Sequence, residues 1–167
     1  SQKDPKNVRA FFSLGAVLER QKKYDEAEKA FRSALALAPD SAITLNYLGY
    51  MNADRNVKVA EALSMIQKAL EADPENGSYL DSLAWALYRL GRHGEAEAAI
   101  RKAIVTQEKN AVVIAHLGLI LAAEGDHAEA LKYLRLSLEG EDEDGELDRT
   151  LVENKIRDLS RAAQKKP

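Results

Sequence analysis

Apolar residues recur three and four positions apart in short runs along this chain, and polar breaks separate the runs. This spacing places the apolar side chains on one stripe of an α-helix. The four clearest breaks lie at residues 21–23, 54–56, 91–92 and 124–126. Because each break joins two apolar runs, the pattern predicts an all-α chain built from helix-turn-helix pairs.

A Glu-Ala dipeptide marks a longer period in the same pattern. It occurs at residues 26–27, 61–62, 95–96 and 129–130, in steps of 35, 34 and 34 residues. A period of about 34 residues is typical of stacked helical repeats. The longer first step indicates one extra residue between Gly49 and Glu61, which a turn absorbs at little cost.

This period divides the chain into repeats. We predict the end of a preceding repeat at residues 1–7, repeats at 8–41, 42–76, 77–110 and 111–144, and a capping helix at 145–167. Residues 4–7 match residues 73–76, which close the second repeat, so we expect the chain to be the C-terminal piece of a longer array. One small residue in each repeat would let its two helices approach closely, at Gly15, Gly49, Ala84 and Gly118.

An acidic loop at residues 140–146 and a last amphipathic stretch follow the fourth repeat. The apolar side of this stretch consists of Leu147, Leu151, Ile156, Leu159 and Ala163. Repeat arrays need a terminal element with a polar outer face, so we expect a capping helix, with partner binding as the alternative. The loop does not predict a calcium site, because Gly140 and Leu151 would stand where an EF-hand needs oxygen ligands.

Several residue types recur in register between the repeats. They include Leu-Gly pairs at residues 14–15, 48–49 and 117–118, the step from Ala27 to Phe31, and the closing prolines Pro39 and Pro74. This pattern resembles the tetratricopeptide repeat family over residues 4–140. The resemblance implies a right-handed superhelical solenoid in which the first helix of each repeat lines a concave groove. Residues 45–50 and 80–85 are similar to bacterial arrays, some of them envelope lipoproteins that serve as adaptors.

The resemblance also assigns positions in the groove, and we call the ten residues placed there the groove residues. They are Phe12, Asn46, Tyr47, Tyr50, Asp81, Trp85, Tyr88, Arg89, His116 and Leu119. Aromatic residues and arginine are enriched at binding hot spots, so we expect an exposed aromatic centre around Trp85 and a smooth apolar end in the fourth repeat. Packing between adjacent repeats is the alternative for Trp85 and Tyr88. Asn46 and Asp81 would hydrogen-bond a partner's backbone, or a neighbour within the groove wall.

The chain has 167 residues, a net charge of −3 and no cysteine. This charge gives no broad attraction to nucleic acid, and the lack of cysteine excludes disulfides and thiol chemistry. No phosphate-binding loop or nucleophile elbow occurs, and His93, His116 and His127 lack the spacing of metal ligands. We therefore expect a protein without enzymatic activity, cofactor or metal. No apolar run reaches the roughly 18 residues that a membrane span needs.

These observations favour a protein-interaction scaffold that binds a peptide or helical segment of a partner in its groove. One alternative is an assembly module that self-associates through the array. Another is a helical repeat that reads single-stranded RNA, against which the lack of a Lys/Arg stripe counts. The bacterial envelope, the periplasm and the cytoplasm are all compatible with the sequence.

Family members that capture the acidic tails of chaperones hold a carboxylate with Lys, Asn and Arg side chains. At the matching positions this chain has Phe12, Ala16, Ser78 and Ser82. We therefore expect that it does not bind such tails.

Overall fold

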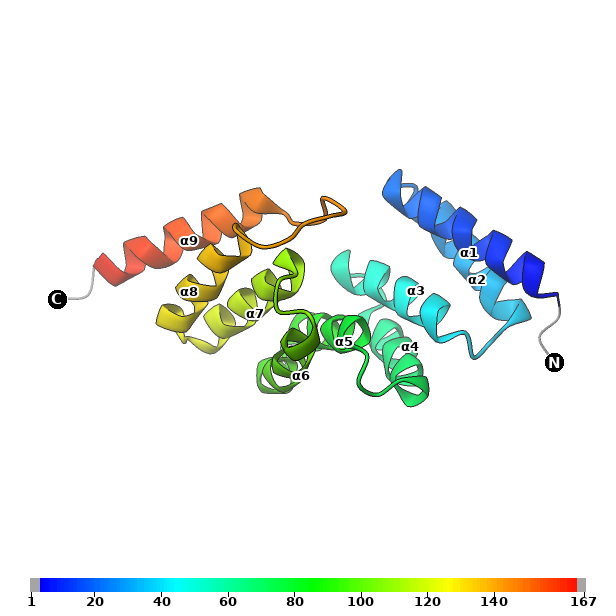
Figure 1. The fold of residues 1–167 in the computed structure, drawn as a ribbon, viewed down its shortest axis with the longest axis horizontal. Coiled ribbons are helices and arrows are strands. Elements are labelled where there is room, and N and C mark those ends of the chain that lie inside the picture. Colours follow the sequence, from blue (N-terminus) through cyan, green and yellow to red (C-terminus); the bar gives the residue numbers. More distant parts are fainter. Residues whose placement is uncertain (1–3, 165–167) are drawn as a thin grey trace. The chain divides into compact units, whose positions relative to one another are not determined.

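The computed structural model describes residues 4–164. Within this range the chain forms nine α-helices and no β-strand, which confirms the predicted all-α class (Figure 1). The helices are α1 (Pro5–Arg20), α2 (Tyr24–Leu37), α3 (Ala42–Asp54), α4 (Val59–Ala72), α5 (Gly77–Arg89), α6 (His93–Thr106), α7 (Ala111–Glu124), α8 (His127–Ser137) and α9 (Arg149–Gln164). They form two compact parts, of which the N-terminal part ends at Pro74 and the C-terminal part begins at Glu75.

The first eight helices pair in sequence order, α1 with α2, α3 with α4, α5 with α6 and α7 with α8. The turns within these pairs fall at the breaks in the apolar pattern. The turn between α3 and α4 covers residues 55–58 and is the longest of the four. Asn56 and Lys58 have positive φ angles there, so the extra residue of the second repeat is taken up by backbone in the left-handed region.

The start of α1 differs from the matching segment before α5. Pro5 is the first residue of α1, and the Asp4 side chain caps the helix by accepting a hydrogen bond from the Lys6 N–H at 3.1 Å. Residues 74–76, which match residues 5–7, precede α5. The assignment of residues 1–7 to a preceding repeat stays a prediction, and residues 1–3 lie outside the described range.

The core of the N-terminal part joins its two repeats. Ala27 and Phe31 of α2 are buried in one cluster with Leu48 and Met51 of α3. Burial of a Leu, Phe or Met side chain contributes roughly 1.5–3 kcal/mol to the free energy of folding. This cluster therefore stabilises the packing of one repeat against the next. The second helix of one repeat therefore covers one face of the first helix of the next.

Glycine allows close contact within the helix pairs, as the sequence predicts. An added Cβ would lie 2.7 Å from the Phe31 ring at Gly15, 2.7 Å from Ile66 at Gly49 and 2.7 Å from Leu134 at Gly118. Each partner is a buried residue of the paired second helix. A glycine in a helix interior costs about 1 kcal/mol relative to alanine, and the close packing of the pair offsets this cost.

The C-terminal part is built around α7. This helix packs against both α6 and α8, and its residues 113–122 are all buried. Asn110 caps it, since the side-chain Oδ1 accepts hydrogen bonds from the N–H groups of Val112 at 3.0 Å and Val113 at 3.2 Å. A helix that is hydrophobic all round belongs in a core.

The acidic loop lies across the turn between α6 and α7. The Glu141 N–H donates to the Lys109 carbonyl at 2.7 Å, and the Ala111 N–H donates to the Glu141 carbonyl at 2.9 Å. Gly140 approaches so closely that an added Cβ would lie 2.9 Å from the Ala111 Cα. The loop is therefore fixed to the turn by backbone contacts.

Helix α9 packs on α8, but its buried face differs from the predicted one. Val152 and Leu159 are buried, whereas Leu151 is 46% exposed and Ala163 is also exposed. The prediction that Leu151 and Ala163 lie on the packed side is wrong, because the buried side of the helix carries Val152 and Leu159 instead. The capping role of residues 145–167 stays a prediction, and residues 165–167 lie outside the described range.

Two arginines connect successive second helices at equivalent places. Arg32 Nη2 lies 2.7 Å from Glu28 and 2.9 Å from Glu61, the latter on the next second helix. In the same way, Arg101 lies 2.6 Å from Glu97 and 3.0 Å from Glu129. Exposed ion pairs contribute about 0.2–1 kcal/mol each, so they add register more than stability.

Gly118→Ala is expected to destabilise the chain by about 1–3 kcal/mol, because the new Cβ would overpack against Leu134. Gly94→Ala is the control, since a Cβ there meets only Glu124 at 3.6 Å and alanine favours the helix. Urea denaturation measures the free energy of unfolding of both variants. Equal stability of Gly118→Ala and the wild type would contradict the close packing of α7 on α8.

Candidate functional site

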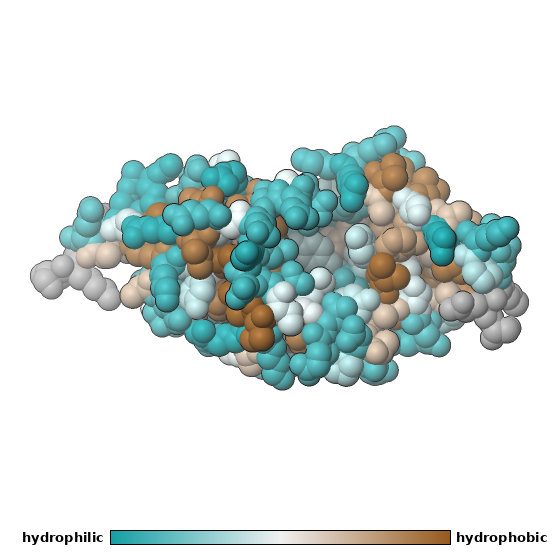
Figure 2. All heavy atoms as spheres, viewed as in Figure 1, coloured by the Kyte–Doolittle hydropathy of each residue, from teal (hydrophilic) through white to brown (hydrophobic). Residues whose placement is uncertain are grey.

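Groove residues of the N-terminal part form an exposed aromatic patch on α1 and α3. The rings of Phe12 and Tyr47 lie edge to face with centroids 5.1 Å apart, and both contact the buried Phe31 ring, at 5.9 and 6.2 Å. Tyr47 is 42% exposed, and Ile43, one turn before it, is exposed as well. We call Phe12, Ile43 and Tyr47 the α1–α3 patch. Hydrophobic atoms gather over these two helices in Figure 2.

Two buried amides lie on α3. Asn46, a groove residue, is largely buried, and its Oδ1 has no hydrogen-bond partner among the described residues. Asn52 is completely buried, and neither atom of its amide has a partner within the described range. Leu18, Leu87 and Leu121 occupy the equivalent position in the other repeats, so the sequence contained a signal for Asn52 that hydrophobic patterning alone passes over.

Glu19 of α1 carries a carboxyl group whose pKa is shifted by its surroundings. Burial raises the pKa of Glu19 above its ordinary value, the nearby Arg20 lowers it, and the negative charge of Asp54 raises it further. The folded chain therefore holds a proton on Glu19 more tightly than the unfolded chain does.

The groove residues of the C-terminal part form a buried cluster. His116 Nδ1 of α7 lies 2.8 Å from Asp81 Oδ1 of α5, and both side chains are buried. The Trp85 ring is stacked on the His116 ring at 4.0 Å and on the Tyr88 ring at 4.8 Å. The guanidinium of Arg89 lies 4.8 Å from the Trp85 ring.

This arrangement corrects the expected exposure of Trp85. The side chain is 3% exposed, so the expectation of an exposed aromatic centre there is wrong. The rings of His116 and Tyr88 are stacked on the Trp85 ring, and the buried polar groups of Asp81 and His116 are hydrogen-bonded to each other. Tyr88 and Arg89 are half-buried and present the edge of the cluster to solvent.

The fourth repeat does not form an exposed apolar end. Leu119 is buried together with its neighbours on α7, because that helix supplies the core of the C-terminal part. The expectation of a smooth apolar surface there is therefore wrong. Tyr50, on α3, is half-buried.

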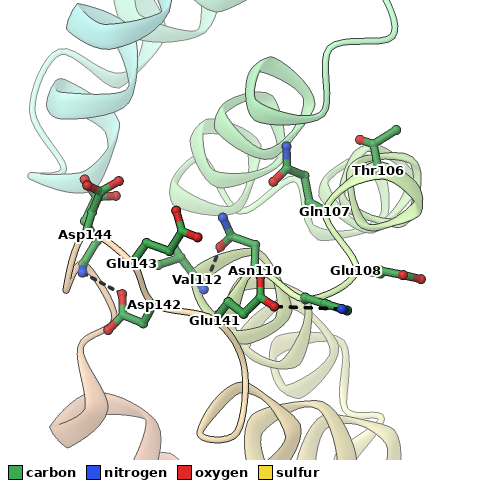
Figure 3. A pocket seen from close by; sticks show the side chains of 11 residues that line it. Thr106, Gln107, Glu108, Asn110, Val112, Glu141, Asp142, Glu143 and Asp144 are labelled. Carbon is green, nitrogen blue, oxygen red and sulfur yellow. Dashed lines mark hydrogen bonds and ion pairs between the residues drawn. The ribbon is translucent and has the colours of Figure 1, made fainter.

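The acidic loop borders an open depression of about 420 Å³ in the C-terminal part (Figure 3). Its lining includes the carboxylates of Glu141, Glu143 and Asp144 and the amides of Gln107 and Asn110. Asp142 is engaged in the loop itself, since its Oδ1 accepts hydrogen bonds from the N–H groups of Glu146 and Leu147.

Two other classes of site find no support in residues 4–164. This range contains no group of three or more His, Cys, Asp or Glu side chains placed to hold a metal ion. Nor does any helix within it combine the length and hydrophobicity needed to cross a bilayer.

Three models described as tetratricopeptide repeat match the chain, at residues 8–41, 51–111 and 111–139. The chain belongs to the tetratricopeptide repeat family. The TPR repeat-containing protein PA4667 of Pseudomonas aeruginosa is 34% identical to it over 114 residues, which are 68% of this chain and 19% of that protein. The chain thus spans only about a fifth of the length of this relative.

Solved tetratricopeptide repeat structures share the fold. PilW, a type IV pilus biogenesis factor, is 26% identical with a TM-score of 0.77, covering 96% of this chain and 74% of its own. The thermophilic TPR protein TTC0263 of Thermus thermophilus is 20% identical with a TM-score of 0.78, and the match covers 93% of this chain and 82% of TTC0263. The first TPR of Spaghetti, bound to an HSP90 peptide, is 24% identical with a TM-score of 0.62, and the match covers 74% of this chain and 95% of the Spaghetti chain. The last two show the fold alone.

These neighbours confirm the assignment to an all-α tetratricopeptide repeat solenoid. The family and fold are typically non-enzymatic, and the bacterial relatives agree with the bacterial likeness of the sequence. The predicted repeat boundaries and the right-handed superhelix stay predictions.

His116→Leu is expected to destabilise the chain by about 1–3 kcal/mol, because it leaves the buried Asp81 carboxylate without its imidazole partner. Adding Asp81→Leu should recover part of the loss, since both polar partners are then replaced by apolar ones. Urea denaturation followed by Trp85 fluorescence measures both. A double variant no more stable than His116→Leu would show that the pair is not what the cluster depends on.

Glu19→Gln is expected to be more stable than the wild type at pH 7, with a difference that shrinks as the pH falls through the raised folded-state pKa of Glu19 and is lost below the ordinary glutamate pKa of 4.5. Since the folded-state pKa of Glu19 is raised, ionisation at higher pH disfavours the folded wild type, and glutamine does not ionise. Thermal unfolding at pH 7 and pH 4 tests this. A difference that is unchanged between the two pH values would contradict the raised pKa.

Proposed function

We propose that this chain is a non-enzymatic protein-interaction module whose N-terminal part binds a segment of a partner protein on the first-helix face. The observation that carries the proposal is the α1–α3 patch, where Ile43 and Tyr47 are exposed next to Phe12. A contiguous apolar patch on a folded surface marks an interaction site more often than a scattered apolar residue does. Membership of the tetratricopeptide repeat family supports the scaffold role.

The α1–α3 patch has the features of a preformed anchor site. Tyr47 is held edge-on against Phe12, with Phe31 buried below both rings, so its orientation is restricted before binding. An aromatic side chain with two rotatable bonds loses little conformational entropy when it binds. An apolar side chain of the partner would be buried against Ile43 and Tyr47.

Asn46 would supply a polar contact in this proposal once its side chain rotates toward the partner, because its Oδ1 is buried in the free chain. Its Oδ1 has no partner among the described residues and lies one residue before Tyr47 on α3. A side-chain amide can bond to the backbone of an extended segment, which has a regular series of N–H and C=O groups. Tyr50, one turn after Asn46, would extend the contact along the helix.

The groove residues of the C-terminal part have a different role in the proposal. Asp81, Trp85 and His116 are buried, so they would act by holding Tyr88 and Arg89 in place. Tyr88 and Arg89 would offer a second contact, and Leu119 would serve the packing of α7 alone.

The partners of the structural relatives are not carried over. PilW is a pilus biogenesis factor and the Spaghetti repeat binds an HSP90 peptide, SRMEEVD. Phe12, Ala16, Ser78 and Ser82 offer no positive charge for a C-terminal carboxylate, so we propose that the chain does not bind the SRMEEVD peptide.

Peptides selected from a random library on the wild-type chain provide the test, with affinity measured by fluorescence anisotropy. Ile43→Ala and Tyr47→Ala should each weaken binding about tenfold or more, the loss expected for a hot-spot residue. Val105→Ala is the control, because Val105 is 76% exposed on α6 and lies outside the first-helix face. Unchanged binding by an Ile43→Ala, Tyr47→Ala double variant would exclude the α1–α3 patch as the site.

A further inference from the structure

The outer face of α1 exposes three large apolar residues at helical spacing. Phe11, Leu14 and Val17 are all exposed, and Leu14 is 50% exposed. They belong to a face of α1 distinct from the α1–α3 patch, since only Phe12 of this helix contributes to that patch.

The same positions are buried on α3 and α7. The equivalents of Phe11, Leu14 and Val17 are Leu45, Leu48 and Met51 on α3, and Ile114, Leu117 and Ile120 on α7. All six are buried, and Leu48 and Leu117 are 0% exposed. On α3 the cover is α2, which supplies Ala27 and Phe31, and α7 packs against α6 in the same way. On α3 and α7, a second helix thus covers this face.

A charge at the edge of this contact repeats with it. Glu61 and Glu129 each form an ion pair with an arginine of the covering helix. Arg32 of α2 lies 2.9 Å from Glu61, and Arg101 of α6 lies 3.0 Å from Glu129. Glu26 is their equivalent in the first repeat and has no ion pair among residues 4–164. Glu95, the remaining equivalent, pairs at 2.6 Å with Arg92, the residue immediately before its own helix α6.

The opposite end of the chain is closed differently. Helix α9 covers α8 and carries charged residues such as Glu153, Arg157 and Asp158 on its exposed surface. Terminal elements of repeat arrays have such a polar outer face. The apolar outer face of α1 lacks this character.

We propose that the outer face of α1 is the docking surface for the second helix of a further repeat joined to its N-terminal end, and that this helix pairs a basic side chain with Glu26. The partner chemistry follows from the two examples in the structure: an amphipathic helix with a small apolar stripe and an arginine or lysine at the edge. Arg32 and Arg101 precede their glutamates by 29 and 28 residues, so the basic residue would lie before Ser1.

The coding sequence upstream of Ser1 gives the first test. It should encode an amphipathic helix with a basic residue 28 or 29 positions before Glu26. An upstream sequence that encodes no such helix would overturn the proposal.

Thiol labelling gives a direct physical test, because the chain contains no cysteine of its own. Residues 1–7 are replaced by a copy of residues 23–41, which include α2 and its turn, so that the graft leads into Val8 as Ser41 leads into Ala42. Leu14→Cys should react rapidly in the ungrafted chain and at least tenfold more slowly in the grafted one. Equal rates would show that the face does not accept such a helix.

Matched variants separate the parts of this result. Leu48→Cys should react slowly with or without the graft, because Leu48 is fully buried. Val105→Cys should react rapidly in both, because Val105 is 76% exposed. An Arg32→Glu change in the grafted copy should speed labelling at Leu14→Cys by up to about fivefold, the effect of an exposed ion pair, and Glu26→Arg should then slow it again. Failure of this reversal would overturn the assigned role of Glu26.

Another copy of the chain is the competing occupant. If labelling of ungrafted Leu14→Cys slows as protein concentration rises, the face is an interface between copies and the proposed occupant is wrong. Concentration-independent labelling supports the proposal.

Discussion

Within each of the two parts, the fold depends on the burial of a first helix against the second helix before it, α3 against α2 and α7 against α6. In the N-terminal part this contact is the cluster of Ala27, Phe31, Leu48 and Met51, which joins the two repeats. A second face of the first helix is taken by its own partner, through a glycine such as Gly49 against Ile66. Only the remaining face is free for a ligand, so the packing itself determines where binding can occur.

That remaining face has different contents in the two parts. On α1 and α3 the aromatic rings rest on Phe31 and leave Ile43 and Tyr47 exposed. On α5 and α7 the face is filled by side chains that bind one another, with Trp85 stacked on His116 and His116 bonded to Asp81. One set of repeat positions therefore supports an open apolar patch in one part and a closed polar–aromatic cluster in the other.

The fold was predictable from the sequence because helix period, turn composition and repeat length agree at many positions. The exposure of the site was not, since a groove position is open or filled according to which side chains its neighbours carry. Trp85 was expected at the surface, yet His116, 35 residues after Asp81, stacks on it. The complementary pair of Asp81 and His116 in adjacent first helices was the signal that could have indicated this. Residue-level packing likewise decided that Val152 and not Leu151 is buried on α9.

The central claim is that the first-helix face of the N-terminal part is where a partner binds. Chemical-shift mapping by NMR, with a library-selected peptide titrated into the labelled chain, tests it most directly. The largest shift changes should fall on Phe12, Ile43, Asn46 and Tyr47, with small changes on α2 and α4. Saturable binding whose largest changes fall on α2, α4 or α6, with α1 and α3 unaffected, would contradict it.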